Sequence, residues 1–115
     1  LDGDMRLSKR ARAAIGDART ICLVSAASAW EITTKARLGK LPGALEVAAD
    51  IGGCLRSQQF TPLDITIDHA QRAGSLPGAH RDPFDRMLIA QSHAENLPLV
   101  SNDAVFDDYG VVRIW

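Results

Sequence analysis

The sequence predicts an α/β fold in which helices cover a mainly parallel sheet. Short apolar segments alternate along the chain with longer segments that have helical character. Parallel neighbouring strands need crossover connections, so this alternation favours a parallel sheet. The chain has 115 residues, of which 46% are hydrophobic and 23% are charged, as is typical of one compact domain. We therefore expect a single domain over residues 1–115.

The N-terminal part predicts a strand between two helices. We expect the first helix from Leu7 to Ala18, with a serine at its N-cap. A buried strand follows from Thr20 to Val24, because this segment is apolar and rich in β-branched residues. The alanine-rich segment from Ser25 to Leu38 predicts a second helix that ends at Gly39.

The middle of the chain predicts weaker elements. Helical character resumes from Ala44 to Gln58, although Gly52-Gly53 should weaken or break that helix. Phe60 to Ile65 is expected to be a short strand or an extended segment. A short helix is expected from Thr66 to Ala73, because Thr66 can cap it.

The C-terminal part predicts one long helix and two strands. After a loop from Gly74 to Arg81, Asp82 caps a helix with Pro83 at its first position, and Asn96 ends it. Two strands follow, over residues 97–101 and 111–115. The apolar face of this helix is predicted to consist of Phe84, Met87, Leu88 and Ala94. We also expect the aromatic residues Trp30, Phe84 and Trp115 to lie in the core.

Composition excludes several classes of site. Cys22 and Cys54 lack a zinc-ligand spacing, and His69, His80 and His93 are dispersed, so surface or packing roles are expected for the histidines. The chain has no phosphate loop, dinucleotide fingerprint or nucleophile elbow. It also has no apolar run of about eighteen residues and no secretory signal, so we expect a cytoplasmic protein. The formal net charge of −1 means that RNA binding would need a local basic patch or bound cations.

Three acidic residues mark a candidate site. Ligand sites in open α/β sheets lie beyond the carboxyl ends of the strands. Glu31 lies in the helix that leaves the first predicted strand, Asp85 lies in the first turn of the long helix, and Asp103 follows the strand over residues 97–101. Converging carboxylates repel one another unless they are protonated or bridged by a cation. Oxygen ligands suit Mg²⁺ or Mn²⁺, which predicts metal-assisted phosphodiester hydrolysis.

Each acid also has a purely structural interpretation. Glu31 could pair with Lys35 one turn later, Asp85 could favour the helix dipole, and Asp103 could be a turn residue. Asp82 is explained as the helix cap. Arg81 and Arg86, which bracket Asp85, are the preferred phosphate contacts, and Lys35 is a further one.

Three segments together resemble the PIN domain, specifically the VapC-type toxin ribonucleases of type II toxin–antitoxin systems. They read SAASAWEITTKARLGKL, HRDPFDRMLIAQSHAENLPLVSNDAVFDDYGV and VVRIW. The resemblance implies a PIN-like three-layer sandwich with a central sheet. It implies that Glu31, Asp85 and Asp103 bind Mg²⁺ or Mn²⁺, and that Ser101 assists as a contact to a metal-bound water or a phosphate.

The same resemblance implies a missing element. Members of the family carry a further aspartate on an N-terminal strand of the form LLLDTH, and this chain begins with LDGDMRLS. We therefore expect an N-terminally truncated domain that lacks its first strand, with Asp2 and Asp4 poor substitutes for the missing acid. Loss of the strand should expose the edge or middle of the sheet.

The resemblance implies a metal-dependent endoribonuclease toxin that is held by a cognate antitoxin protein and forms a homodimer. The alternative is a catalytically inactive, truncated PIN module that acts through protein–protein interaction, which the missing aspartate favours. A phospho-accepting receiver-like domain is a weaker alternative, because no aspartate ends a clear central strand with a later lysine partner.

Overall fold

A computed structural model describes residues 8–17, 19–40 and 49–115. Its α-helices are α1 (Lys9–Gly16), α2 (Ala26–Arg37), α4 (Ile51–Ser57), α5 (Ile67–Ser75) and α6 (Pro83–Glu95), and η1 (Ala104–Tyr109) is a 3-10 helix. Its strands are β1 (Leu23–Ser25), β2 (Thr61–Leu63), β3 (Leu99–Val100) and β4 (Arg113–Ile114). None of the helices in these ranges is long and apolar enough to cross a bilayer.

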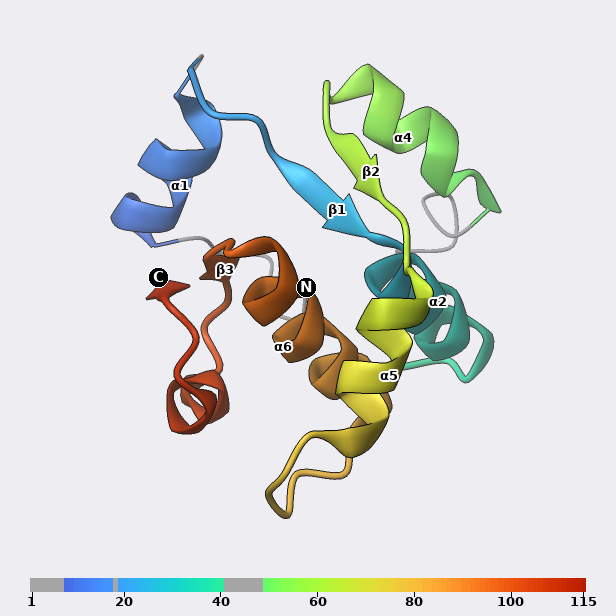
Figure 1. Ribbon diagram of the computed structural model, residues 1–115. Coiled ribbons are helices and arrows are strands. Elements are labelled where there is room, and N and C mark those ends of the chain that lie inside the picture. Colours follow the sequence, from blue (N-terminus) through green and yellow to red (C-terminus); the bar gives the residue numbers. More distant parts are fainter. Residues whose placement is uncertain (1–7, 18, 41–48) are drawn as a thin grey trace.

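The strands confirm the predicted α/β class and its parallel pairing. Within the described ranges they form two separate two-stranded sheets, in which β1 pairs with β2 and β3 pairs with β4. Figure 1 shows β1 running into α2 and β2 running toward α5. Helix α6 packs against both α5 and α2, so these three helices meet beyond the carboxyl ends of the first sheet.

In each two-stranded sheet, a strand pairs with a described strand along one edge only. In β1 and β3 apolar residues lie at the unpaired edge. Leu99 and Ser101 donate their N–H groups to the carbonyls of β4 and its flank, at 2.9 and 3.2 Å. Because successive residues of a strand face opposite neighbours, the backbone groups of Val100 turn away from β4. In the other sheet the N–H of Thr61 donates to the Cys22 carbonyl. The backbone groups of the next residue, Leu23, therefore turn away from β2. Leu23 and Val100 are 39% and 40% exposed.

The predicted helix boundaries agree well with the structure because local side chains fix them. The hydroxyls of Ser8 and Ser25 accept hydrogen bonds from the N–H groups of Ala11 and Ala27, each at 3.0 Å. Thr66 caps α5 in a reciprocal capping box, and Asp82 caps α6. Asn96 ends α6 in the left-handed conformation, at φ 54°. Leu7 and Ala18, the predicted limits of the first helix, lie outside the described residues.

The predicted strands were too long at most ends. Strand β1 begins at Leu23 instead of Thr20 and extends through Ser25, and β2 is confined to Thr61–Leu63. The predicted strands over 97–101 and 111–115 shrink to β3 and β4. Sequence pattern marks the apolar segment, whereas a strand extends only as far as its neighbour is in register.

Two further differences lie between the strands. In the described residues the predicted helix is interrupted at Asp50, just before Gly52-Gly53, and both glycines lie in the first turn of α4. The carboxylate of Asp50 accepts the Gly53 N–H at 3.0 Å, and a Cβ at Gly53 would collide with that carboxylate. The 3-10 helix η1 was not predicted, and Asp103 caps it by accepting the Val105 N–H. The predicted helical residues 44–48 lie outside the described ranges.

The core forms between α6 and the C-terminal part of the chain. Its buried members are Ile89, Phe106 and Val111, with Leu76, Leu88, Leu99, Val105 and Tyr109 packed around them. The prediction that Trp30 belongs to the core was wrong, since it is 58% exposed. Trp115 and the predicted apolar residues of α6 are half-buried. The most buried part of α6 is instead Ile89–Ser92, because α6 packs against both α2 and α5 and buries polar side chains as well.

We predict that Ile89→Ala lowers the free energy of unfolding by about 3 kcal/mol, because it leaves a cavity in a close-packed core. Ile89 is fully buried, whereas Ile67 is 88% exposed. Ile67→Ala is therefore the matched control, and it should change stability by less than about 0.5 kcal/mol. Urea denaturation of both variants measures the difference, and equal effects would contradict the assigned core.

Candidate metal centre

Three carboxylates converge where α2 meets the start of α6. Glu31, Asp82 and Asp85 each offer an oxygen, and these oxygens all lie within 4.8 Å of one another. Glu31 comes from α2, whereas Asp82 and Asp85 come from the N-cap and first turn of α6. Two of these residues were predicted to lie together, and Asp82 is an addition.

The packing of α2 on α6 places Glu31 at this junction. Ala27 and Ile32 bury the inner face of α2, and Glu31 itself is only 7% exposed. Just beside the acids, the rings of Trp30 and Phe84 meet edge to face, with centroids 4.6 Å apart. Trp30 precedes Glu31 and Phe84 precedes Asp85. The aromatic contact and the acidic contact are therefore adjacent in the interface between α2 and α6.

Asp82 has two roles, of which the sequence predicted only the helix cap. One of its carboxylate oxygens accepts the N–H groups of Phe84 and Asp85, at 2.9 and 3.1 Å, which confirms the predicted cap. The same side chain offers an oxygen to the acidic cluster. The spacing of Asp82 and Asp85 contained this signal, because residues three apart at a helix start lie on one side of it.

Lys35 supplies positive charge at the edge of the cluster. Its Nζ lies 2.8 Å from Oε2 of Glu31, one turn along α2, as the structural interpretation of Glu31 predicted. This hydrogen bond is the main cause that raises the pKa of Lys35, and the charges of Glu31, Asp82 and Asp85 add to it. The lysine therefore remains an ammonium ion and offsets part of the repulsion between the acids.

The surroundings of Asp85 disfavour the ionised form of its carboxyl group. Burial raises the pKa of its carboxyl above the ordinary value, and the charges of Asp82 and Glu31 raise it further. A hydrogen bond from His80 acts in the opposite direction without cancelling the effect. The ionised form of Asp85 is therefore less favourable here than in water, and a nearby cation would stabilise it.

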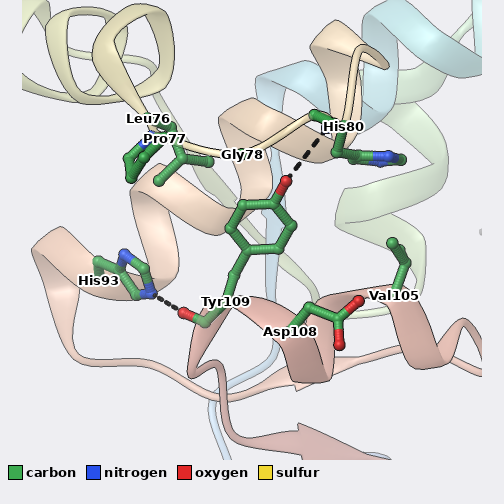
Figure 2. A pocket seen from close by; sticks show the side chains of 9 residues that line it. Leu76, Pro77, Gly78, His80, His93, Val105, Asp108 and Tyr109 are labelled. Carbon is green, nitrogen blue, oxygen red and sulfur yellow. Dashed lines mark hydrogen bonds between the residues drawn. The ribbon is translucent and has the colours of Figure 1, made fainter.

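His80 reaches Asp85 from the loop before α6, with Nε2 2.9 Å from Oδ2. The sequence predicted only a surface or packing role for this histidine. Figure 2 shows the loop passing over Tyr109, whose hydroxyl accepts the backbone N–H of His80 at 3.3 Å. The one sequence signal for His80 was its position five residues before Asp85, just outside the helix cap. A loop that folds back over the cap brings the two side chains together.

Arg86, which the sequence proposed as a phosphate contact, binds the same loop. Its guanidinium donates to the carbonyls of Ala73 and Leu76, and its Nη1 donates to the His80 carbonyl at 3.0 Å. These bonds satisfy the end of α5 and fix the path from there to His80. Most of the hydrogen-bonding capacity of Arg86 is thus used within the protein.

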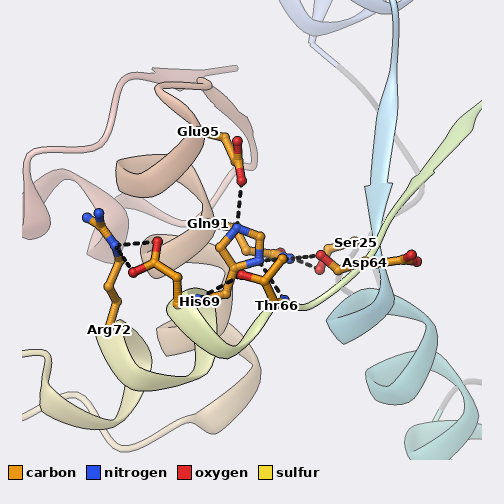
Figure 3. Close-up of polar contacts among 8 residues, drawn as sticks. Ser25, Asp64, Thr66, His69, Arg72, Gln91 and Glu95 are labelled. Atoms are coloured by element: carbon orange, nitrogen blue, oxygen red, sulfur yellow. Dashed lines mark hydrogen bonds and ion pairs between the residues drawn. The ribbon is translucent and has the colours of Figure 1, made fainter.

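A buried polar network sets the position of α2 against α6 (Figure 3). Ser25, at the start of α2, donates its hydroxyl to the side-chain oxygen of Gln91 on α6. The amide nitrogen of Gln91 donates to the Asp64 carbonyl at 3.3 Å and lies 3.4 Å from Nδ1 of His69. Since Nδ1 also accepts the Thr66 N–H, Nε2 of His69 carries the proton that points to Glu95, 2.8 Å away.

The remaining predicted site residues lie outside the three-acid cluster. Asp103 is exposed and its carboxylate caps η1. Ser101 accepts the N–H of Asp103 at 3.1 Å, and its carbonyl accepts from Arg113. Arg81 is exposed and lines a shallow hollow together with His80 and Arg86.

The donor set of the cluster fits a hard divalent cation. All three ligand groups are carboxylates, and Mg²⁺ and Mn²⁺ prefer oxygen donors over nitrogen and sulfur. Burial is the main cause that raises the pKa of Asp85, and the neighbouring charges of Asp82 and Glu31 add to it. A divalent cation there would relieve the repulsion that Lys35 offsets only in part.

Comparisons with known proteins show what the chain is similar to. A family model described as PIN domain matches residues 3–112. Over 62 residues the chain is 44% identical to Ribonuclease VapC16 of Mycobacterium tuberculosis (strain ATCC 25618 / H37Rv). The match covers 54% of this chain and 43% of that protein, so the chain spans less than half the length of the curated relative that it matches. No solved structure matches the chain.

We predict that Asp85→Asn stabilises the metal-free protein. The pKa of Asp85 is raised in the folded state, so its charge destabilises the fold at neutral pH and protonation removes that cost as the pH falls. An uncharged asparagine should raise Tm by roughly 4 °C, and the gain should shrink as the solution is acidified. Thermal denaturation without divalent ions measures it, with the exposed Asp68→Asn as control. A lower Tm for Asp85→Asn would contradict the assigned repulsion.

Proposed function

The chain belongs to the PIN domain family, and from this membership and its acidic cluster we propose that it is a metal-dependent endoribonuclease of the VapC toxin type. The observation that carries the proposal is the convergence of Glu31, Asp82 and Asp85 on one point, with oxygens within 4.8 Å. The similarity to a protein named as a ribonuclease supports the same reaction class.

The carboxylates of Glu31 and Asp85 would hold Mg²⁺ or Mn²⁺, with Asp82 as an added ligand or as the acceptor of a metal-bound water. Bound there, the cation would polarise an RNA phosphate and lower the pKa of the attacking water. We retain Asp103 as a proposed fourth acid, with Ser101 beside it, on the resemblance alone. Both lie just beyond β3, at the carboxyl end of the second sheet.

The protein's own cations define how RNA would be held. Lys35 contacts Glu31 and is well placed to meet a phosphate that approaches the same carboxylates. Arg81 is exposed on the loop beside His80 and can reach solvent phosphates. Arg86 would act indirectly, because its hydrogen bonds shape this loop.

We further propose a cognate antitoxin and a second copy of the chain as partners. Two exposed apolar side chains lie along α2 and its C-cap: Trp30, next to Glu31, is 58% exposed, and Leu38, at the C-cap, is 51% exposed. A partner that covered this face of α2 would bury apolar area and obstruct the approach to Glu31.

A second candidate function is an inactive PIN module that acts through protein–protein interaction. Two observations favour it. The cluster in the described residues has three acids and does not include Asp103. The open strand edges at Leu23 and Val100 could also accept another segment.

Cleavage of a labelled RNA in the presence of Mn²⁺ tests the main proposal. We expect Glu31→Gln and Asp85→Asn each to lower the rate by at least about 100-fold, because each removes a charge that the cation needs. Asp68→Asn is the matched control, since Asp68 is exposed and pairs only with Arg72 among the described residues. It should cleave as the unchanged protein does.

Calorimetric titration of the same proteins with Mn²⁺ separates the two candidate functions. A catalytic domain should bind the ion and lose that binding in Glu31→Gln. An inactive module should bind no ion tightly and cleave no RNA. Undiminished cleavage by Asp85→Asn would contradict the proposed metal centre.

As the pH is lowered, the affinity for Mn²⁺ should begin to fall at a higher pH than it would with an ordinary aspartate as ligand. The pKa of Asp85 is raised, so Asp85 takes up a proton at a higher pH than usual, and that proton competes with the cation. The Kd for Mn²⁺ should rise about tenfold per pH unit below that pKa. Titrations across a pH series measure this slope, and a Kd that stays constant until the ordinary aspartate range would contradict the assignment.

A further inference from the structure

The loop between α5 and α6 is held by hydrogen bonds from Arg86 and to Tyr109. Arg86 binds the carbonyl of Ala73 near the end of α5 and the carbonyls of Leu76 and His80 along the loop. Tyr109 holds it from the other side, through the backbone N–H of His80. Figure 2 shows Gly78 passing close to the Tyr109 ring, where a Cβ would lie 2.6 Å from the hydroxyl oxygen. This segment is therefore fixed in one path against the core.

That path delivers one side chain to the acidic cluster. Both backbone groups of His80 are bonded, its N–H to Tyr109 and its carbonyl to Arg86, and its ring reaches Asp85 at 2.9 Å. The side chains of His80 and Asp85 are 23% and 18% exposed, so water competes only weakly for the contact. Because a carboxylate can only accept, Nε2 of His80 must be the protonated nitrogen.

We propose that His80 is a positioning residue for the metal centre: its Nε2–H holds Oδ2 of Asp85 so that the other oxygen faces the cation. A ligating carboxylate that is free to rotate loses side-chain entropy when it binds, whereas one held by a hydrogen bond is already oriented. This inference rests on the proposed metal centre and adds to it a residue that is not a ligand. Arg86 and Tyr109 act through His80 by fixing its backbone.

Mn²⁺ titration of the full chain tests the role. His80→Ala should weaken binding roughly 10- to 100-fold, as loss of such supporting contacts does elsewhere. His80→Gln retains an N–H donor at a similar reach and should restore affinity to within about threefold. His93→Ala is the matched control: His93 is exposed and bonds the Tyr109 carbonyl instead of an acid, and its loss should leave the Kd unchanged.

The outcomes separate this inference from the proposed function. If the unchanged protein binds Mn²⁺ and His80→Ala binds it equally well, the positioning role is wrong while the metal centre stands. Affinity that stays low in His80→Gln would also overturn it, since the donated proton would then not be what matters. Mn²⁺ binding by none of the proteins would overturn the metal centre.

A measurement on the metal-free protein tests the contact itself, and its main readout comes from the unchanged protein. Nitrogen-15 spectra of the histidine rings should show His80 with the proton on Nε2, and Asp85→Ala should change that signal while leaving the signal of His69 in place. A proton on Nδ1 of His80 in the unchanged protein would overturn the proposal even where Mn²⁺ binds.

Discussion

The feature on which the site depends is the repulsion among three carboxylates held at the contact between α2 and α6. Each is fixed there by a local cause: Glu31 by the buried face of α2, Asp82 by its role as a helix cap, and Asp85 by the first turn that this cap creates. Burial raises the pKa of Asp85, and the charges of Asp82 and Glu31 raise it further. Lys35 and His80 offset only part of the repulsion, which leaves a place for a cation.

The surrounding structure keeps the acids together against this repulsion. On one side, the Ser25–Gln91–His69 network ties the start of α2 and the start of α5 to the middle of α6. On the other side, Arg86 and Tyr109 fix the loop that carries His80. Tyr109 also packs on the core of Ile89, Phe106 and Val111, so the position of His80 is linked to the hydrophobic core.

Much of the helical structure and two of the three acids of the cluster could be predicted from the sequence. Helix starts depend on side chains within three residues, which is why Ser8, Ser25, Thr66 and Asp82 were placed correctly. Glu31 and Asp85 were recognised from their places in the α/β order, one in the helix that leaves the first predicted strand and the other in the first turn of the long helix. Trp30 was misjudged because hydrophobicity predicts burial on average, whereas its exposure depends on what packs against that face of α2. The contacts of His80 and Arg86 could not be predicted from the sequence, because their partners are backbone groups and an acid that a loop brings close.

The sequence by itself determined the α/β class, the capped helices and the presence of inward-facing acids, because periodicity and capping act over a few residues. Only the tertiary structure decided that Asp82 joins Glu31 and Asp85, that Asp103 caps η1 away from them, and that the strands described form two separate pairs. It also decided that Arg86 shapes a loop instead of facing solvent. These outcomes depend on distances between segments far apart in the chain, and packing between elements sets such distances.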